Sequence, residues 1–215
     1  MIKIELNALI SWVLKAILFI IFILAIHYKE YLFAIYSFLA LIITLLPFFI
    51  SRNYNITLPW FFDIIIIVPI FLDVFGQAVR LYEKIWFYDL ITHFLVTAMI
   101  SIIGFTLVYT LHYIEAFRVR VRWLVFLTIM FSIAMGALWE IFEFAVDTFV
   151  GQQIMQDSLQ DTMTDLISVV LGGSIAAILG SYYFLKMPKH KVKHIISPFK
   201  TLVRSERQVV IRLNK

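Results

Sequence analysis

Cysteine is absent from this 215-residue sequence, and only 15% of the residues are charged. The lack of cysteine excludes disulfide scaffolds, thiolate zinc sites, iron–sulfur clusters and thiol nucleophiles, and it leaves the redox compartment undetermined. Three catalytic signatures are also missing from the sequence: a glycine-rich phosphate loop, a GxSxG nucleophile elbow and an HExxH metal motif. These absences exclude the commonest phosphate-binding, serine-hydrolase and metalloprotease sites.

Most of the sequence consists of long apolar runs. Hydrophobic residues make up 62% of the chain, which is typical of integral membrane proteins. The runs are each about 18 to 25 residues long, which at about 1.5 Å per residue matches a hydrocarbon core of roughly 30 Å. The first run lacks a small-residue cleavage site, so we expect it to be retained. The sequence predicts an all-α integral membrane protein, a bundle of about six transmembrane helices over residues 8–27, 31–50, 59–75, 89–113, 123–147 and 161–184.

The distribution of basic residues predicts the orientation of this bundle. Six spans place both termini on one side, and fourteen of the eighteen Lys and Arg residues fall on that side, against three on the other. By the positive-inside rule both termini are cytoplasmic and the protein lies in the inner, or plasma, membrane. We expect one six-helix transmembrane domain over residues 1–186 and a basic cytoplasmic tail over residues 187–215.

The tail leaves two alternatives open. Ser197 and Pro198 are suited to the start of an amphipathic helix that lies on anionic lipid, and a disordered basic segment fits the composition equally well. Membrane lipid is the expected partner. Nucleic-acid binding is not expected, because the orientation of a membrane protein already explains the positive charge.

Acidic residues gather near one end of three predicted helices. In the segment 136–165, carboxylates recur at spacings that place them on one face of each helix: Glu140, Glu143 and Asp147 in the first half, and Asp157, Asp161 and Asp165 in the second. The preceding predicted helix carries Asp89 and His93 at i and i+4. The alternation of spans places all of these residues towards the extracytoplasmic face.

The negative charge of these carboxylates has to be neutralised if they lie within the membrane. Insertion of an ionised carboxylate into a membrane costs about 2.5 to 3.5 kcal/mol unless it is paired, hydrated or bound to a cation. Carboxylates with one imidazole and no thiolate suit Mg²⁺, Mn²⁺, Ca²⁺, Fe²⁺ or Zn²⁺. The predicted ligands of this divalent metal are Asp89, His93, Glu140, Glu143, Asp147, Asp161 and Asp165.

Several of these residues also have simpler interpretations. Asp89, Asp157 and Asp161 suit the first turn of a helix, where a carboxylate interacts favourably with the dipole. Ser158 and Asp161 fit ordinary capping. A proton relay among crowded carboxylates is a further alternative that needs no metal. Glu140 and His93 are explained least well in these ways, since neither lies at a predicted helix end.

Three further features are interpreted structurally. Lys15 lies within the first predicted helix, as a residue that faces the bundle or extends to the interface. Asp63 lies in the first turn of the third predicted helix, where it suits the dipole. Gly173, Ala177 and Gly180 have a small-residue spacing that favours close packing of the last span.

Two sequence segments carry a resemblance to a known family. The segments LYEKIWFYDLITHF and ALWEIFEFAVDTFVGQQIMQDSLQDTMTDLISVVLGG lie within residues 75–173. Together they resemble the YjdF-like family of uncharacterised polytopic inner-membrane proteins and, more distantly, the VanZ-like group linked to envelope and glycopeptide resistance. The resemblance implies a multi-pass membrane protein and brings no established reaction with it.

These observations lead to three functional hypotheses. The first is a metal-assisted site that hydrolyses or transfers a group on a phosphorylated or lipid-linked envelope substrate, with Glu140 or Glu143 as catalytic base. The second is a cation- or proton-coupled transporter that uses the same carboxylates, and the third is a non-catalytic structural or regulatory membrane protein. A transporter needs polar groups beyond the acids, where the predicted helices look mostly apolar, so the sequence favours a one-sided site.

Overall fold

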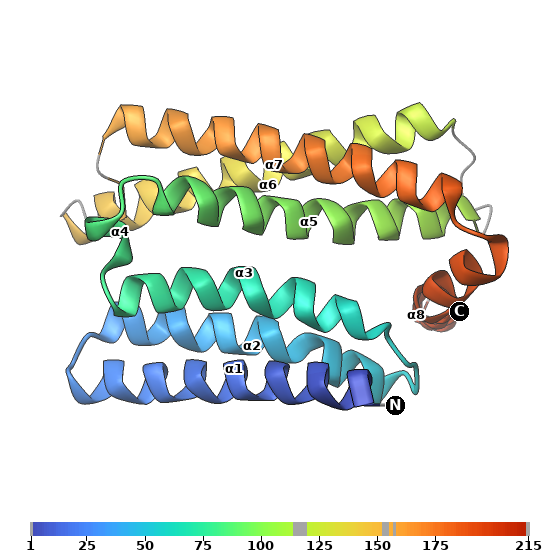
Figure 1. The fold of residues 1–215 in the computed structure, drawn as a ribbon, viewed down its shortest axis with the longest axis horizontal. Coiled ribbons are helices and arrows are strands. Elements are labelled where there is room, and N and C mark those ends of the chain that lie inside the picture. The colour runs from blue at the N-terminus through green and yellow to red at the C-terminus, as the bar shows by residue number, and fades with distance from the viewer. Residues whose placement is uncertain (1, 114–119, 152–154, 157, 214–215) are drawn as a thin grey trace. The chain divides into compact units, whose positions relative to one another are not determined.

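Helices form the secondary structure of this chain (Figure 1). The computed structural model describes residues 2–113, 120–151, 155–156 and 158–213, and within these ranges there are helices and no strand. Six of the described helices are long and apolar enough to cross a membrane, by length and composition. The prediction of an all-α protein with six candidate spans is therefore confirmed, while the side on which the termini lie stays a prediction.

The six long apolar helices begin and end within three residues of their predicted boundaries, except that the first begins at Ile2 and not at residue 8. In chain order the helices are α1 (Ile2–His27), α2 (Tyr31–Asn53), α3 (Trp60–Ala78), α4 (Leu81–Lys84), α5 (Tyr88–Tyr113), α6 (Val121–Val150), α7 (Leu159–Lys186) and α8 (Lys189–Leu213). The single turn α4 was not predicted. In the tail the structure forms a helix, the first of the two alternatives. It begins at Lys189, earlier than the predicted start at Ser197, and Pro198 lies inside it.

Packing divides the chain into two compact units, Met1–Trp86 with Ser197–Lys215, and Phe87–Ile196. In the first unit α1, α2 and α3 contact one another. In the second unit α5, α6 and α7 form a three-helix arrangement in which α5 and α7 have the most extensive contact. The expected division into residues 1–186 and 187–215 stays a prediction.

A buried ion pair joins two helices of the first unit. Lys15 on α1 is 5% exposed, and its Nζ lies 2.7 Å from Asp63 Oδ1 on α3 and 2.9 Å from Ser11 Oγ. Lys15 therefore faces the helix bundle. Asp63 lies in the first turn of α3, as predicted, and also neutralises this lysine.

A second polar cluster of the first unit is built around Asp73 near the end of α3. The hydroxyl groups of Tyr36 and Tyr82 each donate a hydrogen bond to one of its carboxylate oxygens. These bonds join α2, α3 and α4. The segment after α3 thus includes a tyrosine, Tyr82, that holds α4 against α3.

Very small residues allow the close approach of helices in the second unit. A Cβ at Gly172 of α7 would lie 2.5 Å from the backbone oxygen of Phe94 on α5, and a Cβ at Gly136 of α6 would lie 2.4 Å from Val169. A Cβ at Gly173 would meet Ser132 at 2.8 Å. In membranes, such close contacts replace the hydrophobic driving force that is lost in lipid. The predicted role of Gly173 agrees with this geometry, whereas a Cβ at Gly180 would make ordinary van der Waals contact with Phe105 at 3.9 Å.

The buried faces of α5 and α6 contain many hydroxyl groups, so the expectation that these helices are mostly apolar beyond the acids is wrong for their inner faces. Thr106, Thr110, Thr128 and Ser132 are all at most 1% exposed. Each donates a hydrogen bond to the carbonyl four residues earlier in its own helix. Their hydroxyls are therefore satisfied locally and allow tight packing.

Candidate functional site

Two side chains one turn apart on α5 form the first part of the site. His93 Nε2 lies 3.3 Å from Asp89 Oδ1, as the i, i+4 spacing predicts. Asp89 is in the first turn of α5, so the predicted interaction with the helix dipole also applies to it. The His93 side chain is only 13% exposed, which holds its imidazole inside the helical unit.

Helix α7 brings Asp165 to the same imidazole. Asp165 is 2% exposed, and its Oδ2 lies 3.9 Å from His93 Nε2. The close approach of α7 to α5 at Gly172, two turns further along α7, makes this convergence possible. One potential ligand atom from each of Asp89, His93 and Asp165 lies within 4.8 Å of the other two. The three side chains thus have the spacing of a small metal site.

Helix α6 supplies a carboxylate to the other ring nitrogen. Glu140 is 5% exposed, and its Oε1 lies 3.8 Å from His93 Nδ1. Gln156, in the segment between α6 and α7, donates through Nε2 to the Glu140 carbonyl at 3.2 Å and lies 3.4 Å from Glu140 Oε2. The imidazole therefore lies between carboxylates that approach it from three helices.

Two oxygen atoms of this cluster lack a hydrogen-bond partner in the part of the chain that the structure describes. They are Glu140 Oε1 and Asp165 Oδ1, and both are buried. Within the same residues no Lys or Arg forms an ion pair with Glu140, Glu143 or Asp165. A buried carboxylate with neither a cation nor a donor is costly in a low-dielectric environment, so the cluster has acceptor capacity for a ligand.

Glu143 lies one turn after Glu140 on α6 and is 8% exposed. Its Oε1 accepts a hydrogen bond of 2.8 Å from the indole nitrogen of Trp139. This contact fixes the carboxylate, and the tryptophan is a site residue that the sequence reasoning missed. The predicted role of Glu143 as ligand or base stays a prediction.

The remaining predicted ligands make local contacts. Asp147 accepts hydrogen bonds from the backbone N–H groups of Met155 and Gln156, which fixes the connection between α6 and α7. Ser158 caps α7 by accepting from the Asp161 backbone nitrogen at 3.2 Å, so the predicted capping is confirmed. Asp157 lies outside the described residues. The structure brings Asp89, His93, Glu140 and Asp165 together, and metal ligation by Asp147 and Asp161 stays a prediction.

Gln156 is the second site residue that the sequence reasoning missed. Its amide reaches Glu140 because Asp147 holds the backbone of Gln156 itself, so one acid positions a partner for another. The sixteen-residue separation gives no helical periodicity from which this contact could be predicted. The position of a glutamine between two groups of acidic residues was the one feature of the sequence that could have indicated this contact.

Six candidate spans and a buried histidine–carboxylate cluster define a multi-pass membrane protein with a polar centre inside one helical unit. A sequence model of the family described as "Predicted membrane protein (DUF2238)" matches residues 10–186, and the chain belongs to this family. The family match confirms the resemblance to a family of membrane proteins. The finer YjdF-like and VanZ-like resemblances stay predictions.

A curated relative gives a similar picture. A Thermotoga maritima protein with the printed name "Uncharacterized protein" is 35% identical over 100 residues, which is 46% of this chain and 50% of the relative. The chain thus spans about half the length of this relative. No solved structure matches the chain.

Proposed function

We propose that the second unit binds one divalent metal ion through Asp89, His93 and Asp165. The observation that carries this proposal is the convergence of three ligand atoms within 4.8 Å beside a buried carboxylate oxygen that lacks a hydrogen-bond partner in the described chain. Ligands that lie about 2.0 to 2.6 Å from an ion are up to about 4 to 5 Å apart. The three side chains are therefore within reach of a single ion.

Glu140 supports this arrangement as a partner of the ligand histidine. A histidine that binds a metal through one ring nitrogen usually donates a hydrogen bond from the other to a carboxylate or carbonyl. Here Nε2 is the nitrogen near Asp89 and Asp165, and Nδ1 faces Glu140 at 3.8 Å. The geometry favours Nε2 as the metal ligand and Glu140 as the group that orients the ring.

The chemistry that such a centre would perform is hydrolysis or transfer on a phosphorylated or lipid-linked envelope substrate. A metal ion among carboxylates activates water and stabilises negative charge on a phosphoryl oxygen. Glu143, held by Trp139, is placed one turn from Glu140, so either glutamate is a candidate base. An extracytoplasmic position near the headgroup layer, which the distribution of basic residues predicts, would give such a site access to lipid-linked phosphates.

Metal analysis of the purified full-length protein tests this proposal. After dialysis against each candidate ion, we expect close to one equivalent in the wild type and loss of most of it in His93→Ala and Asp165→Asn. His112→Ala changes another histidine on α5 and serves as the matched control. A wild type without stoichiometric metal would contradict the metal centre, and retention of metal by both variants would contradict the assigned ligands.

A substrate assay tests the catalytic part separately. Phosphatidic acid and a polyprenyl diphosphate in detergent micelles are suitable probes, with release of phosphate as the readout. We expect phosphate release that depends on the metal, and we expect at least one of Glu140→Gln and Glu143→Gln to reduce the rate of release by at least tenfold. A metal-loaded protein that releases no phosphate from either probe would contradict this substrate class.

The second candidate function is cation- or proton-coupled transport, and the buried hydroxyl groups favour it. Thr106, Thr110, Thr128 and Ser132 continue a polar interior beyond the carboxylates, although each donates to its own helix. Ion flux into liposomes that contain the purified protein distinguishes the two functions. Flux that His93→Ala abolishes, without phosphate release, would favour the transporter.

A further inference from the structure

A pocket of about 380 Å³ lies in the first unit, where α1 ends and α2 begins and where α3 ends. Its lining combines aliphatic and aromatic residues, including Ile21, Leu24 and Phe33, with the polar residues Glu30, Gln77 and Arg80. The candidate spans that frame it end at His27 and Ala78, so Glu30 and Arg80 lie just beyond the apolar segments and Gln77 lies in the last turn of one. A pocket with an apolar and a polar part at this level has the form of a site for an amphiphile.

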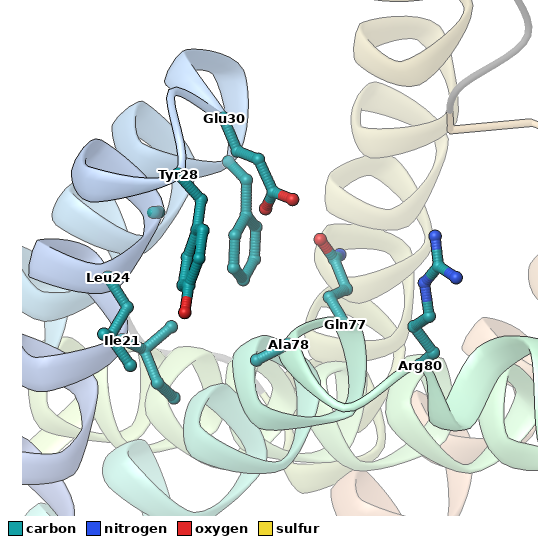
Figure 2. A pocket seen from close by; sticks show the side chains of 9 residues that line it. Ile21, Leu24, Tyr28, Glu30, Gln77, Ala78 and Arg80 are labelled. Carbon is teal, nitrogen blue, oxygen red and sulfur yellow. The ribbon is translucent and has the colours of Figure 1, made fainter.

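The polar groups of this pocket have free bonding capacity. Among the described residues, Glu30 forms no ion pair and the Gln77 side chain forms no hydrogen bond. Arg80 contacts Glu83 through Nε at 3.4 Å, and both side chains are largely exposed, so both terminal nitrogens of the guanidinium remain available. Figure 2 shows Glu30 and Gln77 turned towards each other, with Arg80 beyond Gln77 and with Ile21 and Leu24 at the opposite side.

The backbone presents Arg80 in an uncommon conformation. Its φ of 59° lies in the left-handed region, which is uncommon for residues other than glycine, asparagine and aspartate. Lys29, directly before Glu30, also has a positive φ of 64°. Both connections that border the pocket thus turn sharply at a residue with a long side chain. The turns place a carboxylate and a guanidinium at one rim.

We propose that this pocket binds the headgroup of a phospholipid that carries both a phosphate and a primary ammonium group, as phosphatidylethanolamine does. The guanidinium of Arg80 suits a phosphate, to which it donates two hydrogen bonds. The carboxylate of Glu30 and the amide oxygen of Gln77 accept hydrogen bonds from the ammonium group. The apolar residues Ile21, Leu24 and Phe33 contact the start of the acyl chains.

The opposite charges at the rim decide between lipid classes. A phosphatidylglycerol headgroup has no cation, so Glu30 would face the anionic lipid without a counter-charge. A phosphatidylcholine headgroup has a cation that lacks N–H donors, so it forms no hydrogen bond with Glu30 or Gln77. The expected order of affinity places phosphatidylethanolamine above both of the others.

Native mass spectrometry of the full-length protein, after removal of bound lipid in detergent, tests this order. Titration with dioleoyl-phosphatidylethanolamine, dioleoyl-phosphatidylcholine and dioleoyl-phosphatidylglycerol is expected to show one high-affinity adduct, with at least fivefold preference for the ethanolamine lipid. Equal affinity for the three lipids would show ordinary annular contact and overturn the proposal.

Two charge variants assign the preference to the rim. Glu30→Gln is expected to remove the preference for ethanolamine over glycerol headgroups, and Arg80→Gln is expected to weaken binding of all three lipids. Arg52→Gln, which removes a charge at the opposite end of α2 and outside the lining, is the control and should keep the wild-type preference. All three positions are solvent-exposed, so the variants should fold, which the unchanged midpoint of thermal unfolding would verify. An unchanged preference in Glu30→Gln would overturn the assignment.

Discussion

The contact of α7 with α5 at Gly172 gives a sharp test of how helix packing builds the site. In Gly172→Ala the new Cβ would lie 2.5 Å from the backbone oxygen of Phe94, whereas ordinary van der Waals contact begins at 3.4 Å. The obstacle is backbone, which no side-chain rotation removes. The two helices must therefore separate locally by about 0.9 Å, the difference between these distances.

This separation acts directly on the proposed metal ligands. Phe94 follows His93 in the chain, and Asp165 lies two turns before Gly172 on α7. A shift of about 0.9 Å would increase the distance from His93 Nε2 to Asp165 Oδ2 from 3.9 Å towards about 4.8 Å, which is close to the upper limit of about 4 to 5 Å for two ligands of one ion. We expect metal affinity to fall by about 10- to 100-fold.

The same substitution should lower stability. Overpacking costs about 1 to 3 kcal/mol, and the higher helix propensity of alanine offsets up to about 1 kcal/mol of this. Gly180→Ala is the matched control on the same helix, because its Cβ would have its nearest neighbour at 3.9 Å. Isothermal titration with Mn²⁺ and thermal unfolding in one detergent measure both effects. If Gly172→Ala matches Gly180→Ala in affinity and in unfolding midpoint, the packing argument is refuted.

Three further predictions concern the Lys15–Asp63 ion pair, the hydrogen bonds to Asp73, and the connection between α6 and α7. Lys15→Met should lower the free energy of unfolding by an amount towards the lower end of about 3 to 5 kcal/mol, because it leaves the Asp63 carboxylate without its partner. In denaturant titration the double variant with Asp63→Asn should regain part of this free energy, and a double variant whose loss equals the sum of the two single losses would contradict the pairing. Tyr82→Phe should cost about 1.5 kcal/mol through loss of a hydrogen bond to the Asp73 carboxylate, and an unchanged unfolding midpoint would speak against that bond. Asp147→Ala should release the backbone of residues 155–156, so limited proteolysis between residues 150 and 158 should accelerate while metal affinity falls less than tenfold; a complete loss of metal would instead make Asp147 a ligand.

The membrane class and the spans could be predicted from the sequence because each depends on a local quantity. Length and hydropathy of a run decide whether a helix crosses a bilayer, and both are fixed without knowledge of the neighbours. The pairing of Asp89 with His93 was predictable for the same reason, since i and i+4 are adjacent on any helix.

The convergence within the acidic cluster was predictable only in part. Periodicity identifies the face on which Glu140 and Asp165 lie, but the rotation and approach of the helices decide which acid meets His93. That approach depends on Gly172, one residue away from the small-residue positions that the spacing indicated. Asp147 shares the helical stripe of Glu140, yet its carboxylate binds a loop backbone that no periodicity describes.

Ion pairs between residues far apart in the sequence could not be predicted from the spacing of charged residues either. Lys15 and Asp63 are 48 positions apart, and each had an adequate local explanation as an isolated residue. Their pairing emerges only when α1 and α3 pack together. A buried lysine and an acid at compatible depths on two helices are the signal from which such a pair could be inferred.

Pulsed electron paramagnetic resonance of the Mn²⁺-loaded protein tests the central claim most directly, because it detects nitrogen atoms bound to the metal. The chain has five histidines, and the proposed centre uses the Nε2 atom of one. We predict coupling to a single histidine nitrogen, which disappears in His93→Gln and persists in His112→Gln. Absence of nitrogen coupling in the wild type, or its persistence in His93→Gln, would contradict a metal centre built on His93.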